Sequence, residues 1–217
     1  MRVSYPWKFK SENYHIRLVL KENIDLSKHF NASSNKYFDV STNDILLTFS
    51  NVISSINEKE KIEYHEFIVK CKVKFKGNTY YYPLMTFVDN AYSIIRGYYL
   101  GFEKEISNIS VENDNISVEN KLINLKINTK LVENKEEYDS YPFILVRNYS
   151  FDEDTKVEEV VQLVSKDYLR NKEESFEISE GDTVELLRNI GVSADLVIKQ
   201  KNYYVEDEFV LEGVRRI

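Results

Sequence analysis

The decisive stretch of the sequence, residues 80–105, reads YYYPLMTFVDNAYSIIRGYYLGFEKE. It is apolar and rich in aromatic residues, and it presents one lysine, Lys104, directly after a Gly-Phe-Glu corner. Only the neutral amine of a lysine attacks a carbonyl carbon, and apolar surroundings favour the neutral amine because they penalise the charged one. The stretch therefore makes Lys104 a candidate for Schiff-base chemistry, although an ordinary surface lysine at a strand end would fit the same residue types.

Seven residues of this stretch form the pattern D-N-x-x-x-x-x-R-G-x-x-x-G-F-x-K: Asp89, Asn90, Arg96, Gly97, Gly101, Phe102 and Lys104. The pattern resembles the acetoacetate decarboxylase superfamily, in which the lysine after the Gly-aromatic corner forms an imine with a β-keto acid. Upstream, Tyr64-His65-Glu66 is similar to the family's Tyr-x-Glu, which carries an active-site glutamate. The resemblance implies that Lys104 and Glu66 are catalytic, and it extends more loosely from Pro6 to the C-terminus.

The same resemblance implies a closed β cone or barrel with Lys104 in its hydrophobic interior, and a homo-oligomer. It further implies a lyase that acts on a keto acid through a lysine Schiff base. Two alternatives stay open: an imine-forming aldolase or dehydratase of the same superfamily, which releases no CO2, and a non-catalytic barrel that binds a small apolar ligand. Six tyrosines would line the pocket of such a barrel: Tyr80, Tyr81, Tyr82, Tyr92, Tyr98 and Tyr99.

Three positions depart from the family pattern. Glu105 stands where the family commonly has a second lysine, Glu12 where it has a carboxylate-binding arginine, and Ser50-Asn51 where it has another glutamate. Without that arginine, a small β-keto acid loses a charge-assisted partner for its carboxylate. We therefore expect acetoacetate to be a poor substrate, and larger or less charged carbonyl compounds to react better. Arg17 and Lys10 are the first basic residues to consider as a replacement.

The rest of the chain alternates apolar and polar residues, as strands do. Strands are expected over 14–20, 37–40, 45–53, 66–76, 79–88, 122–131, 142–146, 157–170 and 194–213, with two short strands inside 109–120. Helices are expected over 24–30 and 179–189, and either a helix or a strand over 91–100. Nine or more strands with two or three short helices predict an α+β protein, mainly antiparallel β, in a single domain over residues 1–217.

The runs 66–76 and 79–88 are expected to form a hairpin about Gly77-Asn78. Residues 67, 69, 71, 73 and 75 are apolar and share one face of the first strand, so Cys71 is expected to be a buried structural thiol. The lysines of that strand are expected on the opposite, solvent-facing side.

Composition limits the partners. The net charge of −7, without a basic cluster, argues against a nucleic-acid partner. No apolar run approaches the roughly 20 residues that span a bilayer, and no apolar leader follows Met1, which favours a cytoplasmic protein without a membrane partner. The histidines show no metal-ligand spacing, so neither a metal nor a cofactor is expected. The expected partner is a small-molecule keto acid or another carbonyl compound.

Overall fold

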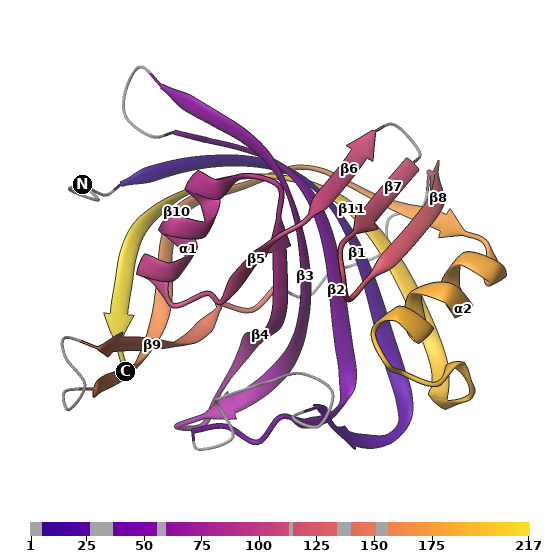
Figure 1. Cartoon of the computed structure of the whole chain (residues 1–217), viewed down its shortest axis with the longest axis horizontal. Helices are drawn as coiled ribbons and strands as arrows, with labels where there is room; N and C mark the ends of the chain where they lie inside the picture. The colour runs from indigo at the N-terminus through magenta and orange to yellow at the C-terminus, as the bar shows by residue number, and fades with distance from the viewer. Residues whose placement is uncertain (1–5, 27–36, 56–59, 113–114, 134–139, 151–155) are drawn as a thin grey trace.

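A computed structural model of the chain describes residues 6–26, 37–55, 60–112, 115–133, 140–150 and 156–217. These residues form a strongly curved sheet, with the helices α1 and α2 toward opposite ends (Figure 1). The strands are β1 (Trp7–Asp25), β2 (Ser41–Ser55), β3 (Lys61–Phe75), β4 (Asn78–Val88), β5 (Lys104–Ile106), β6 (Asn108–Glu112), β7 (Asn115–Glu119), β8 (Asn124–Val132), β9 (Ile144–Ser150), β10 (Lys156–Ile178) and β11 (Val197–Arg216). The helices are α1 (Ala91–Leu100), α2 (Glu180–Asn189) and the short 3-10 helix η3 (Ala194–Leu196).

The strands follow one path in the order β5-β4-β3-β2-β1-β11-β10-β8-β7-β6, and β9 pairs with β10. Neighbouring strands are antiparallel, except that β5 runs parallel to β4. Because β1 pairs with β11, the two ends of the described chain lie side by side in the middle of the sheet. The prediction of a mainly antiparallel α+β protein is confirmed.

The expected closed cone or barrel is not confirmed, because the described strands form an open path that ends at β5 and at β6. A one-residue bridge between Tyr81 of β4 and Phe143 does link two distant parts of this path. Tyr81 N donates a hydrogen bond of 3.0 Å to Pro142 O, and the chain then continues into β9, which pairs with β10. The bridge therefore draws β4 toward the strand pair β9–β10 without extending the sheet around a full circle.

The hairpin of β3 and β4 forms as expected, but its two-residue loop is Lys76-Gly77 rather than Gly77-Asn78. Both loop residues have a positive φ, 48° for Lys76 and 81° for Gly77. Turns with positive φ at both central positions match the twist of antiparallel strands, and glycine adopts this backbone without steric cost.

The sequence leaves 91–100 open between helix and strand, and these residues form the helix α1. Helix α2 begins after Ser179, whose Oγ accepts a hydrogen bond from Asp182 N at 3.1 Å. The helix expected over 24–30 is wrong at its start, since Ile24 and Asp25 belong to β1, and its residues 27–30 lie outside the described residues. Within the described ranges, no helix has the length and hydropathy needed to cross a membrane.

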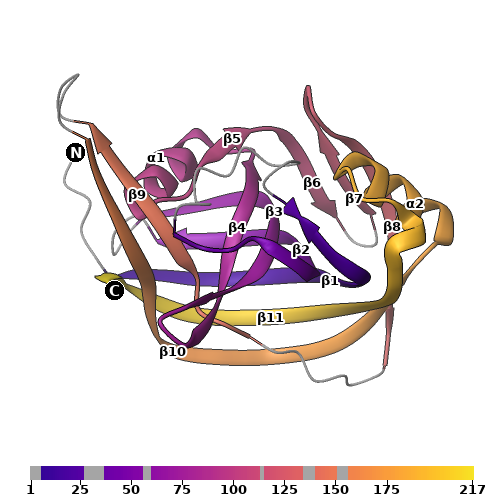
Figure 2. The same cartoon turned by 90° about the horizontal axis from the view of Figure 1, so that it is seen from below.

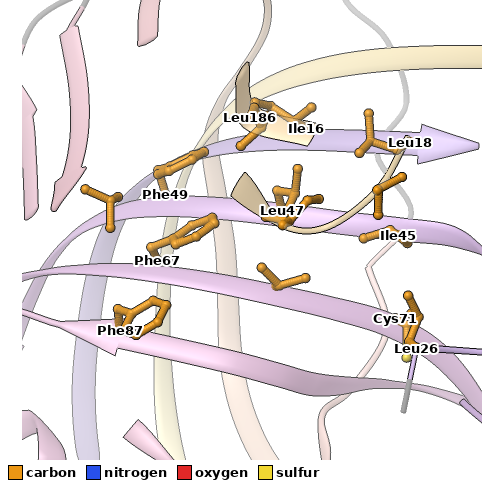
Figure 3. Packing of buried hydrophobic residues seen from close by; sticks show 14 of the residues in the cluster. Ile16, Leu18, Leu26, Ile45, Leu47, Phe49, Phe67, Cys71, Phe87 and Leu186 are labelled. Carbon is orange, nitrogen blue, oxygen red and sulfur yellow. The ribbon is translucent and has the colours of Figure 1, made fainter. Parts of the chain in front are cut away.

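Successive residues of a strand point to opposite faces, so each face of the curved sheet buries a different set of side chains. One face carries the apolar core, which takes alternate residues of β1, β2 and β3: Tyr14, Ile16, Leu18, Ile45, Leu47, Phe49, Phe67, Val69, Cys71 and Val73. Figure 3 shows Phe49, Phe67 and Phe87 in a row across β2, β3 and β4, and the Phe49 and Phe67 rings stack with their centroids 4.5 Å apart. Cys71 is buried as expected, and the opposite face of the same strands is left for a cavity.

Candidate active site

A cavity of about 600 Å³ lies between this second face of the sheet and helix α1. Alternate residues of β1 line the cavity, namely Trp7, Phe9, Ser11, Asn13 and His15. Strands β2, β3 and β11 contribute in the same alternating way, and residues 140–143 complete one side. Figure 2 shows α1 and β9 at the same end of the molecule, away from α2, so the cavity belongs to the α1 end.

Lys104 and Glu66 meet on the wall of this cavity. Lys104 Nζ donates one hydrogen bond to the Glu66 carboxylate and another, of 3.2 Å, to Ser93 Oγ. The side chains of Lys104 and Glu66 are 7% and 13% exposed. Strand pairing explains their meeting, because Lys104 lies opposite Thr86 on β4, and Thr86 lies opposite Ile68, two residues from Glu66. The structure thus brings the two candidate catalytic residues together, and their roles stay predictions.

Aromatic rings complete the surroundings of the Lys104 amino group. Nζ lies 5.3 Å from the centre of the Phe102 ring and 5.7 Å from that of Tyr64, and both rings are buried. Burial, together with the charge of Glu66, raises the pKa of Tyr64, so its hydroxyl stays protonated. The amine therefore contacts a carboxylate with which it can exchange a proton, and two buried aromatic rings lie beside it.

The family pattern also sets the two ends of α1. Asn90 is the N-cap, and its Oδ1 accepts a hydrogen bond of 2.9 Å from the backbone N–H two residues on. Gly101 ends the helix with a φ of 102°, a left-handed C-cap conformation that favours glycine. Asp89 ties the start of α1 to β3, because its carboxylate accepts hydrogen bonds from the backbone N of His65 at 2.8 Å and from Nδ1 of the same residue at 2.7 Å.

Gly97 provides the space through which the Lys104 side chain reaches the cavity. A β-carbon at position 97 would lie 2.5 Å from Cδ and 2.6 Å from Cε of Lys104, well inside a normal carbon–carbon contact of about 3.5–4.0 Å. Gly97 belongs to the buried face of α1 with Ser93, Arg96 and Leu100, at the spacing of one helix face. One side of this helix is therefore a wall of the cavity.

Arg96 fixes α1 onto the sheet at the edge of the cavity. Its guanidinium lies 3.9 Å from the centre of the Trp7 ring, and its Nη1 donates a hydrogen bond of 2.9 Å to Ser54 Oγ. Trp7 is on β1 and Ser54 is on β2, so one side chain joins three elements. A guanidinium suits this position because it stacks on an aromatic face while its edge donates hydrogen bonds.

A chain of polar side chains forms the floor of the cavity. Ser50 Oγ donates to Asn13 Oδ1 at 2.7 Å, and Asn13 Nδ2 donates to Ser11 Oγ at 2.9 Å and to Asp207 Oδ2 at 3.3 Å. Arg170 Nε lies 3.5 Å from Asp207 Oδ1. Burial raises the pKa of Asp207, and its hydrogen-bonding and cationic neighbours oppose that rise. The floor therefore holds a buried acid that already has its own cation.

His15 lies next to this floor, with its Nδ1 2.9 Å from Thr48 Oγ1. Burial, with smaller contributions from the charges of Lys70 and Arg170, lowers the pKa of His15 well below 6.5. His15 is therefore neutral at pH 7 and contributes hydrogen-bonding groups rather than charge.

The prediction that the β3 lysines face solvent is wrong for Lys70, which is 4% exposed and lines the cavity. Residues 64, 66, 68 and 70 alternate along β3 and all line the cavity, so the period-2 pattern already placed Lys70 on the same face as Glu66. Lys72 and Lys74 share that face further along, where Lys72 pairs with Asp44 at 2.9 Å and Lys74 is exposed. The sequence does not show where along the strand the cavity ends.

Two of the departures from the family pattern, Glu105 and Glu12, lie away from the cavity, whereas Ser50 lines it and pairs with Glu66 between β2 and β3. Glu105 is exposed and points away from the cavity, as expected for the strand neighbour of Lys104, and Glu12 does not line it either. Neither candidate replacement for the arginine reaches the cavity: Arg17 forms an ion pair of 2.6 Å with Asp44, and Lys10 has a side chain that is 55% exposed. The basic cavity residues outside the family pattern are Lys70 and Arg170.

Of the six tyrosines expected to line a pocket, Tyr81 lines the cavity. Tyr80 and Tyr82 point to the other face of β4 and join the apolar core. Tyr98 is 67% exposed on the outer side of α1. The remaining tyrosines of the cavity, Tyr64, Tyr141 and Tyr168, come from other parts of the chain.

Comparison with known families decides the relationship. The family model "Acetoacetate decarboxylase (ADC)" matches residues 37–167, which include Glu66, Gly97 and Lys104. The chain belongs to the acetoacetate decarboxylase family. The recognition made from the 80–105 stretch is thereby confirmed. Among curated protein sequences, no significant match is found.

Solved structures of acetoacetate decarboxylase-like proteins share the fold at low sequence identity. An acetoacetate decarboxylase-like enzyme from Sphingomonas wittichii RW1 has a TM-score of 0.74 at 15% identity, covering 98% of this chain and 92% of its own. The enduracididine biosynthesis enzyme MppR, complexed with pyruvate, has a TM-score of 0.67 at 14% identity, covering 100% and 91%. The acetoacetate decarboxylase of Legionella pneumophila subsp. pneumophila str. Philadelphia 1 has a TM-score of 0.66 at 13% identity, covering 100% and 90%.

Proposed function

We propose that this protein is an acetoacetate decarboxylase-like lyase that acts on a keto acid through a Schiff base on Lys104. One observation carries the proposal: Lys104 Nζ contacts the Glu66 carboxylate on the wall of a cavity that Phe102 and Tyr64 make largely apolar. A lysine, an acid–base partner and an enclosed space for a carbonyl compound are the groups that imine chemistry requires.

The reaction begins when Glu66 takes a proton from the Lys104 ammonium and leaves a neutral amine. The amine nitrogen then forms a bond to the carbonyl carbon, and the oxygen takes a proton from that nitrogen to give a carbinolamine. The carbinolamine loses its hydroxyl group as water, which includes the proton that Glu66 had taken, and an iminium results. In a β-keto acid, the electron pair of the breaking C–C bond moves into the iminium as CO2 leaves, which produces an enamine. A proton from solvent, passed on by Glu66, adds to the enamine carbon, and water then hydrolyses the resulting iminium to free the ketone and Lys104.

The size of the cavity favours a second candidate function. A volume of about 600 Å³ lies well within the range of drug-sized ligand sites and exceeds what a molecule as small as acetoacetate needs. The aldolase or dehydratase alternative would use this space for a second carbonyl compound, which the enamine attacks in place of a proton. MppR, of the same fold, has been crystallised with the condensation product of pyruvate and imidazole 4-carboxaldehyde.

Borohydride trapping with a panel of keto acids and aldehydes tests the proposal. One covalent equivalent should appear by intact mass, and peptide mapping should place it on Lys104. Lys74→Ala, which removes an exposed lysine on β3, should trap as the wild type does, whereas Lys104→Ala should not trap. Equal labelling of Lys104→Ala would refute the proposal, and no adduct with any compound would favour the non-catalytic binding barrel. Release of CO2 then separates the lyase from the condensing alternative.

Three further features belong to the proposal. The chain forms a single domain over residues 1–217, supported by the pairing of β1 with β11. It acts in the cytoplasm. It assembles as a homo-oligomer, with which the exposed apolar side chains of Ile95, Tyr98 and Ile106 are compatible.

A further inference from the structure

Lys70 is a buried cation in the cavity that the proposed reaction does not use. Its Nζ lies 5.1 Å from the centre of the Tyr81 ring and 5.0 Å from that of Phe143. Within the described part of the chain, its amino group has neither a hydrogen bond nor an ion pair with another residue, although it is 4% exposed. An ammonium with so little water around it and no acid in direct contact is costly to keep charged.

The other cations of the cavity already have partners. Lys104 contacts Glu66, Arg170 lies beside Asp207, and Arg96 stacks on a ring and donates to a serine. Lys70 therefore differs from them in facing the cavity without a hydrogen bond or ion pair among the described residues, and the charges of Glu66 and Asp207 act on it from further away. Among the described residues, the cavity is lined by four basic side chains and two acidic ones, although the whole chain has a net charge of −7. This local excess of positive charge suits a ligand that brings negative charge with it.

Lys70 and Lys104 both line the cavity, and two aromatic rings that touch each other lie beside them. The Phe102 ring lies 5.3 Å from Lys104 Nζ, and it meets the Phe143 ring edge to face with centroids 5.5 Å apart. Phe143 in turn lies 5.0 Å from Lys70 Nζ. Along β3, Lys70 is four positions after Glu66, about 13 Å at the backbone. Each amino group thus lies near one ring of a contacting aromatic pair.

The geometry points to a substrate with two functional ends: a carbonyl group that reacts at Lys104, and a carboxylate that binds Lys70. An apolar spacer joins them and lies against Phe102 and Phe143. This inference rests on the proposed function, because it takes Lys104 as the residue that forms the imine. It departs from the expectation of a less charged substrate, which followed from the missing arginine alone.

The protonation state of Lys70 agrees with this role. Burial lowers the pKa of Lys70 to about 8, while the charges of Glu66 and Asp207 oppose the shift. The amine is therefore mainly protonated at pH 7 and can form a charge-assisted hydrogen bond with a carboxylate. In acetoacetate the carboxylate is two bonds from the carbonyl carbon, so a molecule with a longer spacer is needed to engage both lysines.

Two aldehydes that differ by one carboxylate group test the inference: benzaldehyde and 4-carboxybenzaldehyde. Each is titrated against the full-length protein at pH 7 with cyanoborohydride, and the concentration for half-maximal labelling of Lys104 is read by intact mass and peptide mapping. The wild type should need about 10- to 100-fold less of the carboxylated aldehyde, as expected for a hydrogen bond to a charged group.

Two substitutions assign this preference to Lys70. Lys70→Met keeps the length and apolar character of the side chain but removes its charge, so the two aldehydes should then label Lys104 at about equal half-maximal concentrations. Because the substitution removes a buried charge that has no directly paired acid, we expect the variant to fold at least as stably. Lys70→Arg keeps a cation and should retain most of the preference.

A second measurement does not depend on imine chemistry. Benzoate should raise the melting temperature of the Lys104→Ala variant more than benzyl alcohol does, and the additional Lys70→Met change should abolish the difference. If Lys104 is not labelled but this difference appears, the anion site stands and the proposed function fails. Equal half-maximal concentrations for the two aldehydes in the wild type, a preference that survives Lys70→Met, or labelling of Lys70 in place of Lys104 would each overturn the inference.

Discussion

Replacing Gly97 with alanine tests whether the Lys104 side chain passes over α1 as the structure shows. The added β-carbon would lie 2.5 Å from Cδ, 2.6 Å from Cε and 2.9 Å from Cγ of Lys104. A normal contact between carbon atoms is about 3.5–4.0 Å, so the lysine side chain must move by about 1 Å. Such a shift separates Nζ from Glu66 and Ser93, and a misplacement of about 1 Å costs about 100-fold in reaction rate.

The fold should survive this change. Alanine is favoured over glycine inside a helix by roughly 1 kcal/mol, which offsets part of the strain that the displaced lysine introduces. We therefore expect the rate of borohydride trapping on Lys104 to fall about 100-fold, while the circular dichroism spectrum stays as in the wild type.

Gly181→Ala is the matched control. Gly181 is also in a helix, but a β-carbon there would meet its nearest neighbour, Ser179 Oγ, at an ordinary 3.8 Å. This variant should trap carbonyl compounds at the wild-type rate. Wild-type trapping by a folded Gly97→Ala protein would show that Lys104 reaches the cavity by another route and would refute the reasoning.

Two further predictions concern Glu66 and His15. Glu66→Gln should lower turnover by about 100-fold or more, because the proton acceptor of Lys104 is lost. Glu63→Gln, at an exposed position of the same strand, should leave turnover unchanged. Equal turnover of the two variants would show that Glu66 takes no part in the reaction. Because the pKa of His15 is lowered in the folded chain, the unfolded chain binds an extra proton below about pH 6.5, and the free energy of unfolding should fall as the pH drops from 6.5 to 5. Urea titrations should show a smaller fall for His15→Gln, and identical pH dependence of the two proteins would contradict the assignment.

Residues 80–105 could be interpreted from the sequence because most of their interactions are local. Asn90 and Gly101 cap the helix that lies between them, and Gly97 makes room for a lysine on the strand that follows this helix. Helix caps and left-handed glycines depend on only a few neighbouring residues, so the sequence pattern itself indicates why these residues are needed. Glu66 was found through its family motif, and strand pairing then accounted for its contact with Lys104.

The closure of the sheet could not be derived in this way. Composition and alternation indicate many antiparallel strands, and they do not specify whether the first and last strands of the pairing order meet. The bridge between Tyr81 and Phe143 depends on one residue pair and on the course of the chain ahead of β9. No periodic pattern in the sequence marks such a contact.

The same bridge explains why Lys70 was assigned to solvent. Lys70, Lys72 and Lys74 are indistinguishable by spacing, since all three occupy the same face of β3. Phe143 is far from them in the sequence, but its bridge to Tyr81 places both rings about 5 Å from the Lys70 amino group. Lys72 and Lys74 lie beyond the cavity that these rings border, where acidic partners or water stabilise their charge. A long-range contact therefore determines whether a lysine on this strand is exposed to water or buried in the cavity. Only the buried lysine can bind a substrate in the way we propose.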